Sequence, residues 1–207
     1  MNKNNLYNFD LNLKKQYSKI LGVDEVGRGC IAGPLVVCGV ILKDNFYDGN
    51  IKDSKKIKSI EQRKKLKNLI IKNSLFYLYE IIEPETIDLI GPKKASVLGM
   101  TKIANQLIDY YDLCLTDYEK IPDLLKTQMN ITKGDNTSFS IACASIVAKS
   151  IRDDLMEQLH NLYPYFEFNK NQGYLTKRHI ELLNKYGAIK KIHRFSYKPM
   201  KLMNSKI

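Results

Sequence analysis

The chain has 207 residues, of which 44% are hydrophobic, and this length allows one sizeable core or a core with a small appendage. It contains no run of eighteen apolar residues and no secretory hydrophobic segment near its start, so we expect a cytoplasmic protein that does not insert into a membrane. A formal net charge of +11, from 33 Lys and Arg against 22 Asp and Glu, argues against an acidic protein and favours a polyanionic partner.

The first part of the chain alternates between strand-like and helix-like segments. Residues 1–17 are polar and rich in Asn and Lys, which predicts a frayed or loosely docked lead-in. Three apolar runs predict strands, at 20–23, 33–42 and 75–82, of which the first two are buried and paired. Between the second and third runs, Asp48-Gly49-Asn50 signals a turn, and Ser59 predicts the cap of a helix that extends to about residue 73.

Helices and two short strands are predicted in the next part of the chain. One helix begins at Pro84 and a longer one covers 94–110. Two short apolar runs, 113–116 and 129–132, predict strands. The longest predicted helix covers 138–162, and its small residues allow it to lie close to the sheet.

Beyond Tyr163 the composition becomes polar and basic, with one clear helix at 176–185 that Gly187 ends. We therefore predict three parts: a polar lead-in (1–17), an α/β core (18–162) and a small C-terminal helical extension (163–207). The strand and helix pattern of the core predicts a sheet flanked by helices.

The positive charge is concentrated in two clusters. Residues 52–67 hold eight Lys or Arg against two acids, and residues 168–207 hold ten against one, so together they supply more than the whole net charge. Each cluster alone could be a solvated surface. Because the two clusters flank an acidic centre, we favour contacts with the phosphates of a nucleic acid.

That acidic centre consists of carboxylates placed at or beyond the ends of predicted strands: Asp24, Glu25, Asp117 and Asp135. Strand ends in an open α/β sheet gather around one crevice, so acids about ninety residues apart can meet. Hard oxygen ligands suit Mg²⁺ or Mn²⁺, and two such ions can activate a water for in-line phosphoryl displacement. Each acid alone could instead be a solvated turn residue or a helix cap, an alternative that fits Asp135 best.

The adjacent acids Asp24 and Glu25 are not equivalent. Neighbouring side chains on a strand point to opposite faces, so they are not expected to bind one metal equally. Either the chain kinks there or one residue contributes through its carbonyl, and Asp24 is the stronger candidate. The glycines around Arg28, Gly27 and Gly29, let the backbone approach a ligand closely.

The opening motif Asp24-Glu25-Val26-Gly27-Arg28-Gly29 resembles the first motif of ribonuclease HII, and three later blocks continue the resemblance. They are Asp53-Ser54-Lys55-Lys56, the segment from Lys133-Gly134-Asp135 to Arg152-Asp153, and Gly173-Tyr174 with Thr176, Lys177, His179 and His193-Arg194. Four ordered blocks over about residues 18–200 are a specific signal. The resemblance implies a ribonuclease H-like mixed β-sheet flanked by helices, with a C-terminal extension that binds substrate.

The resemblance also implies an activity. Family members are endoribonucleases that hydrolyse the phosphodiester 5′ of ribonucleotides, in RNA/DNA hybrids and at single ribonucleotides in duplex DNA, and leave 3′-hydroxyl and 5′-phosphate ends. It implies two Mg²⁺ or Mn²⁺ ions held by Asp24, Glu25, Asp117 and Asp135. It further implies sugar recognition by Gly27, Arg28 and Gly29, phosphate contacts from Lys55 and Lys56, and packing of Tyr174 on the neighbouring deoxyribose. We expect a monomer.

The sequence departs from the family pattern after the third acid. Tyr118 follows Asp117 where the family usually has Gly, which leaves Asp112 and Glu119 as alternatives for that acid. Ribonuclease HIII is an alternative family, but Arg28 and the short lead-in argue against it. A non-catalytic nucleic-acid-binding remnant is a second alternative, and the retention of all four acid positions argues against it.

Other polar residues of these blocks have structural interpretations. Lys149 and Arg152 could form surface pairs with Asp153 and Asp154, and His179 and His193 more often serve structure than catalysis. The four cysteines, Cys30, Cys38, Cys114 and Cys143, are scattered and contain no C-x-x-C pair, which predicts free thiols.

Overall fold

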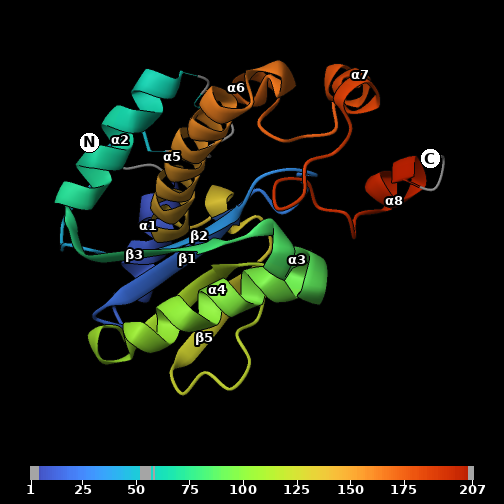
Figure 1. Cartoon of the computed structure of the whole chain (residues 1–207). Coiled ribbons are helices and arrows are strands. Elements are labelled where there is room, and N and C mark those ends of the chain that lie inside the picture. Colours follow the sequence, from blue (N-terminus) through green and yellow to red (C-terminus); the bar gives the residue numbers. More distant parts are fainter. Residues whose placement is uncertain (1–4, 52–56, 58, 205–207) are drawn as a thin grey trace.

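A five-stranded mixed sheet forms the centre of the computed structural model, which describes residues 5–51, 57 and 59–204 (Figure 1). The strands are β1 (Ile20–Val26), β2 (Leu35–Leu42), β3 (Ser74–Ile82), β4 (Leu113–Asp117) and β5 (Thr127–Ile131), in the order β3-β2-β1-β4-β5. β2 is antiparallel to β1 and β3, whereas β1, β4 and β5 are mutually parallel. The predicted mixed sheet is confirmed.

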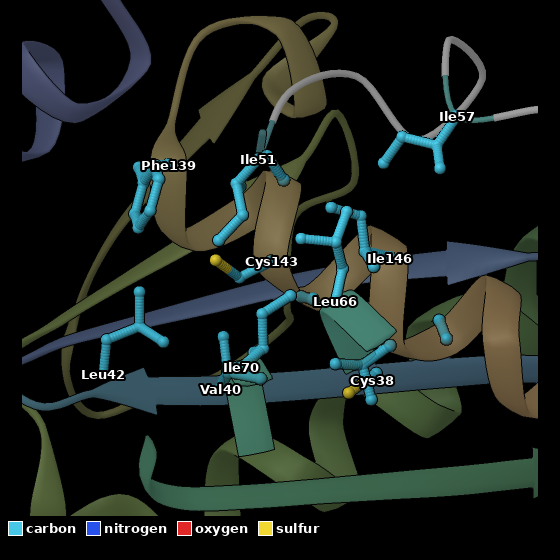
Figure 2. Close-up of a cluster of buried hydrophobic side chains, with 14 of the residues drawn as sticks. Cys38, Val40, Leu42, Ile51, Ile57, Leu66, Ile70, Phe139, Cys143 and Ile146 are labelled. Atoms are coloured by element: carbon cyan, nitrogen blue, oxygen red, sulfur yellow. The ribbon is translucent and has the colours of Figure 1, made fainter. Parts of the chain in front are cut away.

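Helices cover both faces of this sheet (Figure 1). α2 (Ile60–Lys72) and α5 (Phe139–Leu162) lie on one face, and α3 (Pro84–Ile90) and α4 (Pro92–Gln106) on the other. Every residue of β2 is buried, because side chains alternate toward the two helical layers. Figure 2 shows one layer, in which Cys38, Val40 and Leu42 of β2 meet Leu66 and Ile70 of α2 and Cys143 and Ile146 of α5.

The start of α5 lies directly against β1. A Cβ added at Gly22 would come within 2.4 Å of the Ser140 carbonyl carbon, so the helix can approach the strand only because residue 22 has no side chain. Ser138 caps the helix by accepting a hydrogen bond from Ile141 N at 3.3 Å. The predicted helix at 138–162 is confirmed, and its close approach brings its polar residues next to the end of β1.

The lead-in differs from the prediction. Residues Asn5–Leu13 form a helix, α1, and Asp10 in it is buried. The Asp10 carboxylate accepts hydrogen bonds from the backbone N–H of Ser140 at 2.8 Å and from its hydroxyl at 2.5 Å. The prediction of a frayed or loosely docked segment is therefore wrong for these residues, because a polar sequence there contains a side chain that caps α5.

The C-terminal part contains α6 (Phe168–Asn171), α7 (Lys177–Tyr186) and α8 (Lys198–Asn204). The side chains of Phe166, Phe168 and Leu182 pack on Ile31 and on Met156 of α5. Thr176 caps α7 and Gly187 follows its last residue, which confirms the predicted helix. The division of the chain into three parts stays a prediction.

Several smaller predictions have clear outcomes. The helix predicted over 94–110 is shorter, because α4 ends at Gln106 and a 3₁₀ turn, Ile108–Tyr110, follows. Ser59 caps α2, and all four cysteines are buried free thiols, as predicted. Within the described residues, no helix combines the length and apolar character needed to cross a membrane.

Candidate active site

The four carboxylates predicted from the sequence line one pocket of about 120 Å³, together with Val26, Ser145, Lys149 and Tyr174. Asp24 and Glu25 lie near the carboxyl end of β1, and Asp117 is the last residue of β4. Asp135 lies in the 3₁₀ turn η3 (Gly134–Asn136) that follows β5. Because β1, β4 and β5 are parallel, their carboxyl ends open on the same edge of the sheet.

Asp24 faces α5. It is 4% exposed, it is hydrogen-bonded to Ser145, and its Oδ1 accepts the Glu25 backbone N–H at 2.7 Å. Burial raises the pKa of Asp24 well above its usual range, and the nearby carboxylates of Glu25 and Asp117 raise it further. The charged form of Asp24 is therefore costly until a cation arrives.

The side chain of Glu25, which follows Asp24 on β1, points to the opposite face of the strand. The strand continues in regular register through Val26, so the chain does not kink between the two acids. The Oε1 atom of Glu25 lies 3.4 Å from Arg28 Nη1, whereas Oε2 is buried and has no hydrogen-bond partner among the residues that the structure describes. Burial raises the pKa of Glu25 to about 7, although Arg28 opposes the shift. An unpartnered buried carboxylate oxygen is a suitable ligand for a cation.

Asp117 links the ends of two strands. Its Oδ1 accepts the backbone N–H of Gly134 at 2.7 Å, which holds η3 beside β4. Asp135, the next residue, is 2% exposed, and its Oδ1 accepts a hydrogen bond from the Asn136 side chain at 3.0 Å. One acid of the pocket thus positions the turn that carries another.

The two alternatives for the third acid lie elsewhere. Asp112 accepts the Lys19 backbone N–H at 2.9 Å, at the beginning of β4 and not at its end. Glu119 is 3% exposed and binds Arg28 Nη2 at 2.7 Å and Lys93 Nζ at 3.4 Å. Of these three acids, Asp117 alone lines the pocket.

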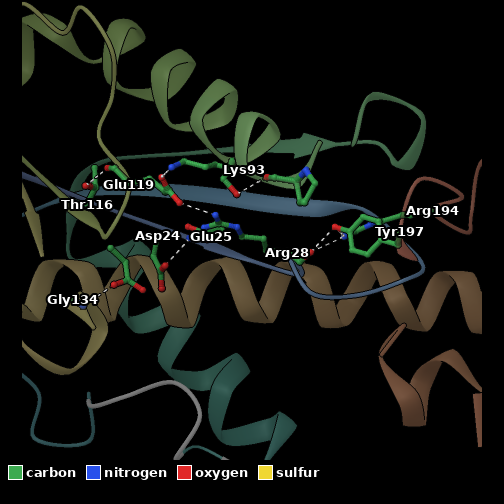
Figure 3. Close-up of polar contacts among 12 residues, drawn as sticks. Asp24, Glu25, Arg28, Lys93, Thr116, Glu119, Gly134, Arg194 and Tyr197 are labelled. Atoms are coloured by element: carbon green, nitrogen blue, oxygen red, sulfur yellow. Dashed lines mark hydrogen bonds and ion pairs between the residues drawn. The ribbon is translucent and has the colours of Figure 1, made fainter. Parts of the chain in front are cut away.

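Two buried arginines, Arg194 and Arg152, hold the loop that follows β1. Arg194 donates to the carbonyl oxygens of Gly27 at 2.7 Å and of Gly33 at 2.8 Å, and the Tyr197 hydroxyl donates to Arg28 O at 2.6 Å. In Figure 3, Arg28 lies between Glu119 on one side and Arg194 and Tyr197 on the other. The loop is therefore fixed at both its backbone and its side chain.

Arg152 of α5 holds the same loop from the helix side. Its guanidinium donates to Pro34 O at 2.9 Å, Ala32 O at 3.2 Å and Gln172 O at 3.0 Å. Gly27 has φ +92°, and a Cβ there would lie 2.3 Å from Arg152 Nε. The interpretation of Arg152 as a surface partner of acids is wrong, because the side chain is fully buried and bound to carbonyls.

The remaining predicted residues have different placements. Tyr174 is 45% exposed on the wall of the pocket, and Lys149, also on the wall, forms the expected ion pair with Asp153. Lys55 and Lys56 lie outside the described residues. In the same basic cluster, Arg63 pairs with Asp153, and Lys64 and Lys67 pair with Asp154, so these three cations already have partners in α5.

The residue types that line the pocket suit a cation, but their side chains are not yet arranged as a set of metal ligands. Among the residues that the structure describes, no three His, Cys, Asp or Glu side chains are already arranged to hold a metal ion. The raised pKa values of Asp24 and Glu25 and the unpartnered Glu25 Oε2 show uncompensated negative potential at this edge. Hard oxygen donors of this kind suit Mg²⁺ or Mn²⁺.

Known proteins match this chain over most of its length. The family model described as ribonuclease HII matches residues 21–200. Ribonuclease HII of Mycoplasma mycoides subsp. mycoides is 46% identical over 182 residues, which cover 87% of this chain and 86% of that protein.

Solved structures share the fold. The ribonuclease H2 of Pyrococcus horikoshii superposes with a TM-score of 0.72 at 23% identity, over 91% of this chain and 98% of that one. A Bst ribonuclease HIII in complex with Mn²⁺ has a TM-score of 0.67 at 17% identity, over 91% of this chain and 70% of that one. At these identities the likeness concerns the arrangement of the sheet and helices.

Proposed function

This chain belongs to the ribonuclease HII family and is a ribonuclease H endonuclease, and we propose that its four carboxylates serve to cut the phosphodiester on the 5′ side of a ribonucleotide. The proposed substrates are RNA/DNA hybrids and duplex DNA with single embedded ribonucleotides. The products carry 3′-hydroxyl and 5′-phosphate ends. The observation that carries the proposal is the convergence of Asp24, Glu25, Asp117 and Asp135 on one pocket whose wall includes Tyr174.

The proposed cofactor is a pair of divalent ions, Mg²⁺ or Mn²⁺, held by these four carboxylates. The unpartnered Glu25 Oε2 and the raised pKa values of Asp24 and Glu25 support it, because a cation would relieve both. The Mn²⁺ bound by the ribonuclease HIII of the same fold is consistent with a divalent ion. When bound, such ions lower the pKa of a water and stabilise the leaving oxygen of an in-line displacement.

The proposed sugar reader is the backbone of Gly27, Arg28 and Gly29. The carbonyls of Gly27 and Arg28 are occupied by Arg194 and Tyr197, whereas the N–H groups of Arg28 and Gly29 make no hydrogen bond with the described residues. The loop therefore offers donors and no vacant acceptor at its first two residues. A ribose 2′-hydroxyl oxygen can accept from such donors, and a deoxyribose has no such oxygen.

The test is a cleavage assay with three duplexes: one with a single ribonucleotide, one RNA/DNA hybrid and one of DNA alone. We expect Mg²⁺ or Mn²⁺ to support a nick 5′ of the ribonucleotide, and we expect the all-DNA duplex to stay intact. EDTA should abolish the reaction. Absence of cleavage with both metals would refute the proposed activity.

Matched substitutions test the assignment of the third acid. Asp117→Asn should abolish turnover, and Asp112→Asn, at the other end of β4, should leave it nearly unchanged. Binding of the duplex, measured by fluorescence anisotropy, should survive Asp117→Asn because phosphate contacts come from other residues. The reverse result for the two variants would place the third acid at residue 112.

A further inference from the structure

Two buried imidazoles lie behind the wall of the pocket. His179 belongs to α7 and is fully buried, and His193 is 1% exposed and forms a β-bridge with Ala32 of the loop after β1. The rings of Phe166 and Phe168 enclose them, with centroid separations of 4.9 Å from Phe166 to His193 and 5.7 Å from Phe168 to His179.

The contacts of His193 fix where its proton lies. The Ile189 backbone N–H is 2.9 Å from His193 Nδ1, and a backbone N–H can only donate, so Nδ1 accepts and carries no hydrogen. The proton of the neutral ring is therefore on Nε2. That atom is 3.2 Å from Nε2 of His179 and donates to it.

The contacts of His179 require the same direction of hydrogen bonding, from His193 toward Tyr174. Its Nδ1 lies 2.9 Å from the carbonyl oxygen of Tyr174, which can only accept, so the proton of this ring is on Nδ1. Its Nε2 is then free to accept from His193. Both ends of the chain, an N–H at Ile189 and a C=O at Tyr174, require one and the same set of tautomers.

Protonation of either imidazole would disrupt this chain of hydrogen bonds. A second proton on His179 would place two N–H groups opposite each other across the 3.2 Å contact, and a second proton on His193 would face the Ile189 N–H. Burial lowers the pKa of both histidines, that of His193 to about 4, which keeps the pair neutral at pH 7. The single arrangement of hydrogens is thus stable under ordinary conditions.

This chain of hydrogen bonds ends at Tyr174, a residue of the pocket wall. The Tyr174 carbonyl also accepts from Thr176 N at 2.9 Å, and the Tyr174 N–H donates to Asn171 O at 2.9 Å. The preceding residue, Gly173, accepts from Ile31 N at 2.9 Å. The main chain of Tyr174 is held on each side, while its ring is 45% exposed toward the carboxylates.

We propose that His193 and His179 are positioning residues for the substrate, and that they act through this one-way hydrogen-bond chain on the Tyr174 backbone. His193 decides the tautomer of His179, and only that tautomer of His179 donates to Tyr174. The proposal rests on the proposed function, because it takes from it the packing of Tyr174 on a substrate sugar. It adds the device that keeps the ring in place.

The first test reads the tautomers without any activity. In protein labelled with ¹⁵N at histidine, NMR should show a protonated Nδ1 and a bare Nε2 for His179, the opposite pattern for His193, and a scalar coupling between the two Nε2 atoms. His160, the third histidine of the chain, is the internal reference. A His179 protonated on Nε2 at pH 7 would overturn the proposal, whatever the enzyme cleaves.

The second test separates positioning from folding by a pair of substitutions at one site. His179→Leu removes the donor to Tyr174 and should raise KM for the duplex with one ribonucleotide about tenfold, with a much smaller change in kcat. His179→Asn places an amide N–H near the position of Nδ1 and should recover most of that loss. His160→Leu, in the last turn of α5, is the control and should leave KM unchanged. Equal KM values for His179→Leu and the unaltered enzyme would refute the positioning role.

A double-substitution cycle identifies Tyr174 as the target. In a Tyr174→Ala background, His179→Leu should cause no further rise in KM, because the ring that it positions is gone. A full additional rise would show that His179 acts elsewhere and would overturn the proposal. If Tyr174→Ala alone leaves KM unchanged, Tyr174 does not position the substrate, and the positioning role of the two histidines is refuted. The cleavage assay and the NMR measurement still test the proposed activity and the tautomers independently of this result.

Discussion

Two groups of buried charges lie at the same end of β1 and are treated in opposite ways. Arg152 and Arg194 are fully buried, and their guanidinium groups donate to carbonyl oxygens of the loop after β1. Asp24 and Glu25 are also largely buried, and their pKa values rise because of this burial and, in addition, because other carboxylates lie nearby. The protein satisfies the arginines fully, but it satisfies the acids only in part.

This difference indicates which buried charges serve structure and which serve chemistry. A charge whose hydrogen bonds are supplied within the chain stabilises the fold when kept and destabilises it when removed. A charge that lacks compensation costs stability and is retained for a ligand from outside. Substitutions in the two groups should therefore have opposite effects on stability and on activity.

The largest expected effect is on activity, in the acidic group. Asp24→Asn should lower kcat by on the order of a thousandfold, because a carboxylate that is proposed to bind the metal is replaced by a neutral amide. The melting temperature should stay equal or rise. Single-turnover cleavage together with thermal unfolding measures both, and a fall in melting temperature of several degrees would break the comparison.

The arginine group should show the reverse. Arg194→Met should lower the free energy of unfolding by about 3 kcal/mol, because the buried carbonyls of Gly27 and Gly33 would lose their donors. Urea unfolding measures the change. Arg178→Met, on the exposed side of α7, is the matched control, and its effect should be much smaller, because an exposed ion pair contributes little to stability. Similar losses for both arginines would remove the distinction between buried bracing and surface pairing.

Glu25→Gln tests whether the negative charge of the buried acids lowers the free energy of unfolding. Without metal, at pH 8, it should raise the free energy of unfolding by about 1–2 kcal/mol. The Glu25 pKa is raised to about 7 in the folded protein from 4.5, so the folded state binds more protons between these values and stability falls as pH rises through them. The gain from Gln should therefore disappear below about pH 4.5. A gain that is independent of pH would point to packing instead of charge.

The smallest expected effect concerns Tyr118, beside Asp117. Its backbone has φ +67°, a conformation that costs a bulky residue about 1 kcal/mol, and its side chain is 62% exposed. Tyr118→Gly should raise the free energy of unfolding by about 0.5 kcal/mol, with the gain reduced by the greater freedom of an unfolded glycine. Chemical denaturation measures it. A loss of stability would mean that the Tyr118 ring makes favourable contacts that outweigh the strain.

The sheet and the pocket were largely predictable because their signals are local. Apolar runs ending at Asp24 and Asp117 mark strand ends, and the parallel arrangement of β1 and β4 then brings those ends together. The identity of the third acid needed the structure, since Asp112, Asp117 and Glu119 all lie near one short strand. The contacts of Asp112 with Lys19 and of Glu119 with Arg28 hold these two acids away from the pocket, and such contacts leave no periodic pattern.

The bracing of the site was not predictable for a related reason. Asp10 meets Ser140 across 130 residues, and Arg194 meets Gly27 across 167 residues. A side chain that binds a backbone N–H or carbonyl group can be satisfied by any residue type at the far end, so the partner has no signature in the sequence. Polarity at Asp10 and Arg152 indicated the surface, and the structure places both in the interior.

The span between Gly27 and Arg194 has a consequence for the order of events during synthesis. All four carboxylates have been translated once the chain reaches residue 135, but the loop that is proposed to read the sugar gains its brace only when Arg194 and Tyr197 have been added. A nascent chain therefore contains all four carboxylates before it can form the hydrogen bonds from Arg194 and Tyr197 that hold this loop.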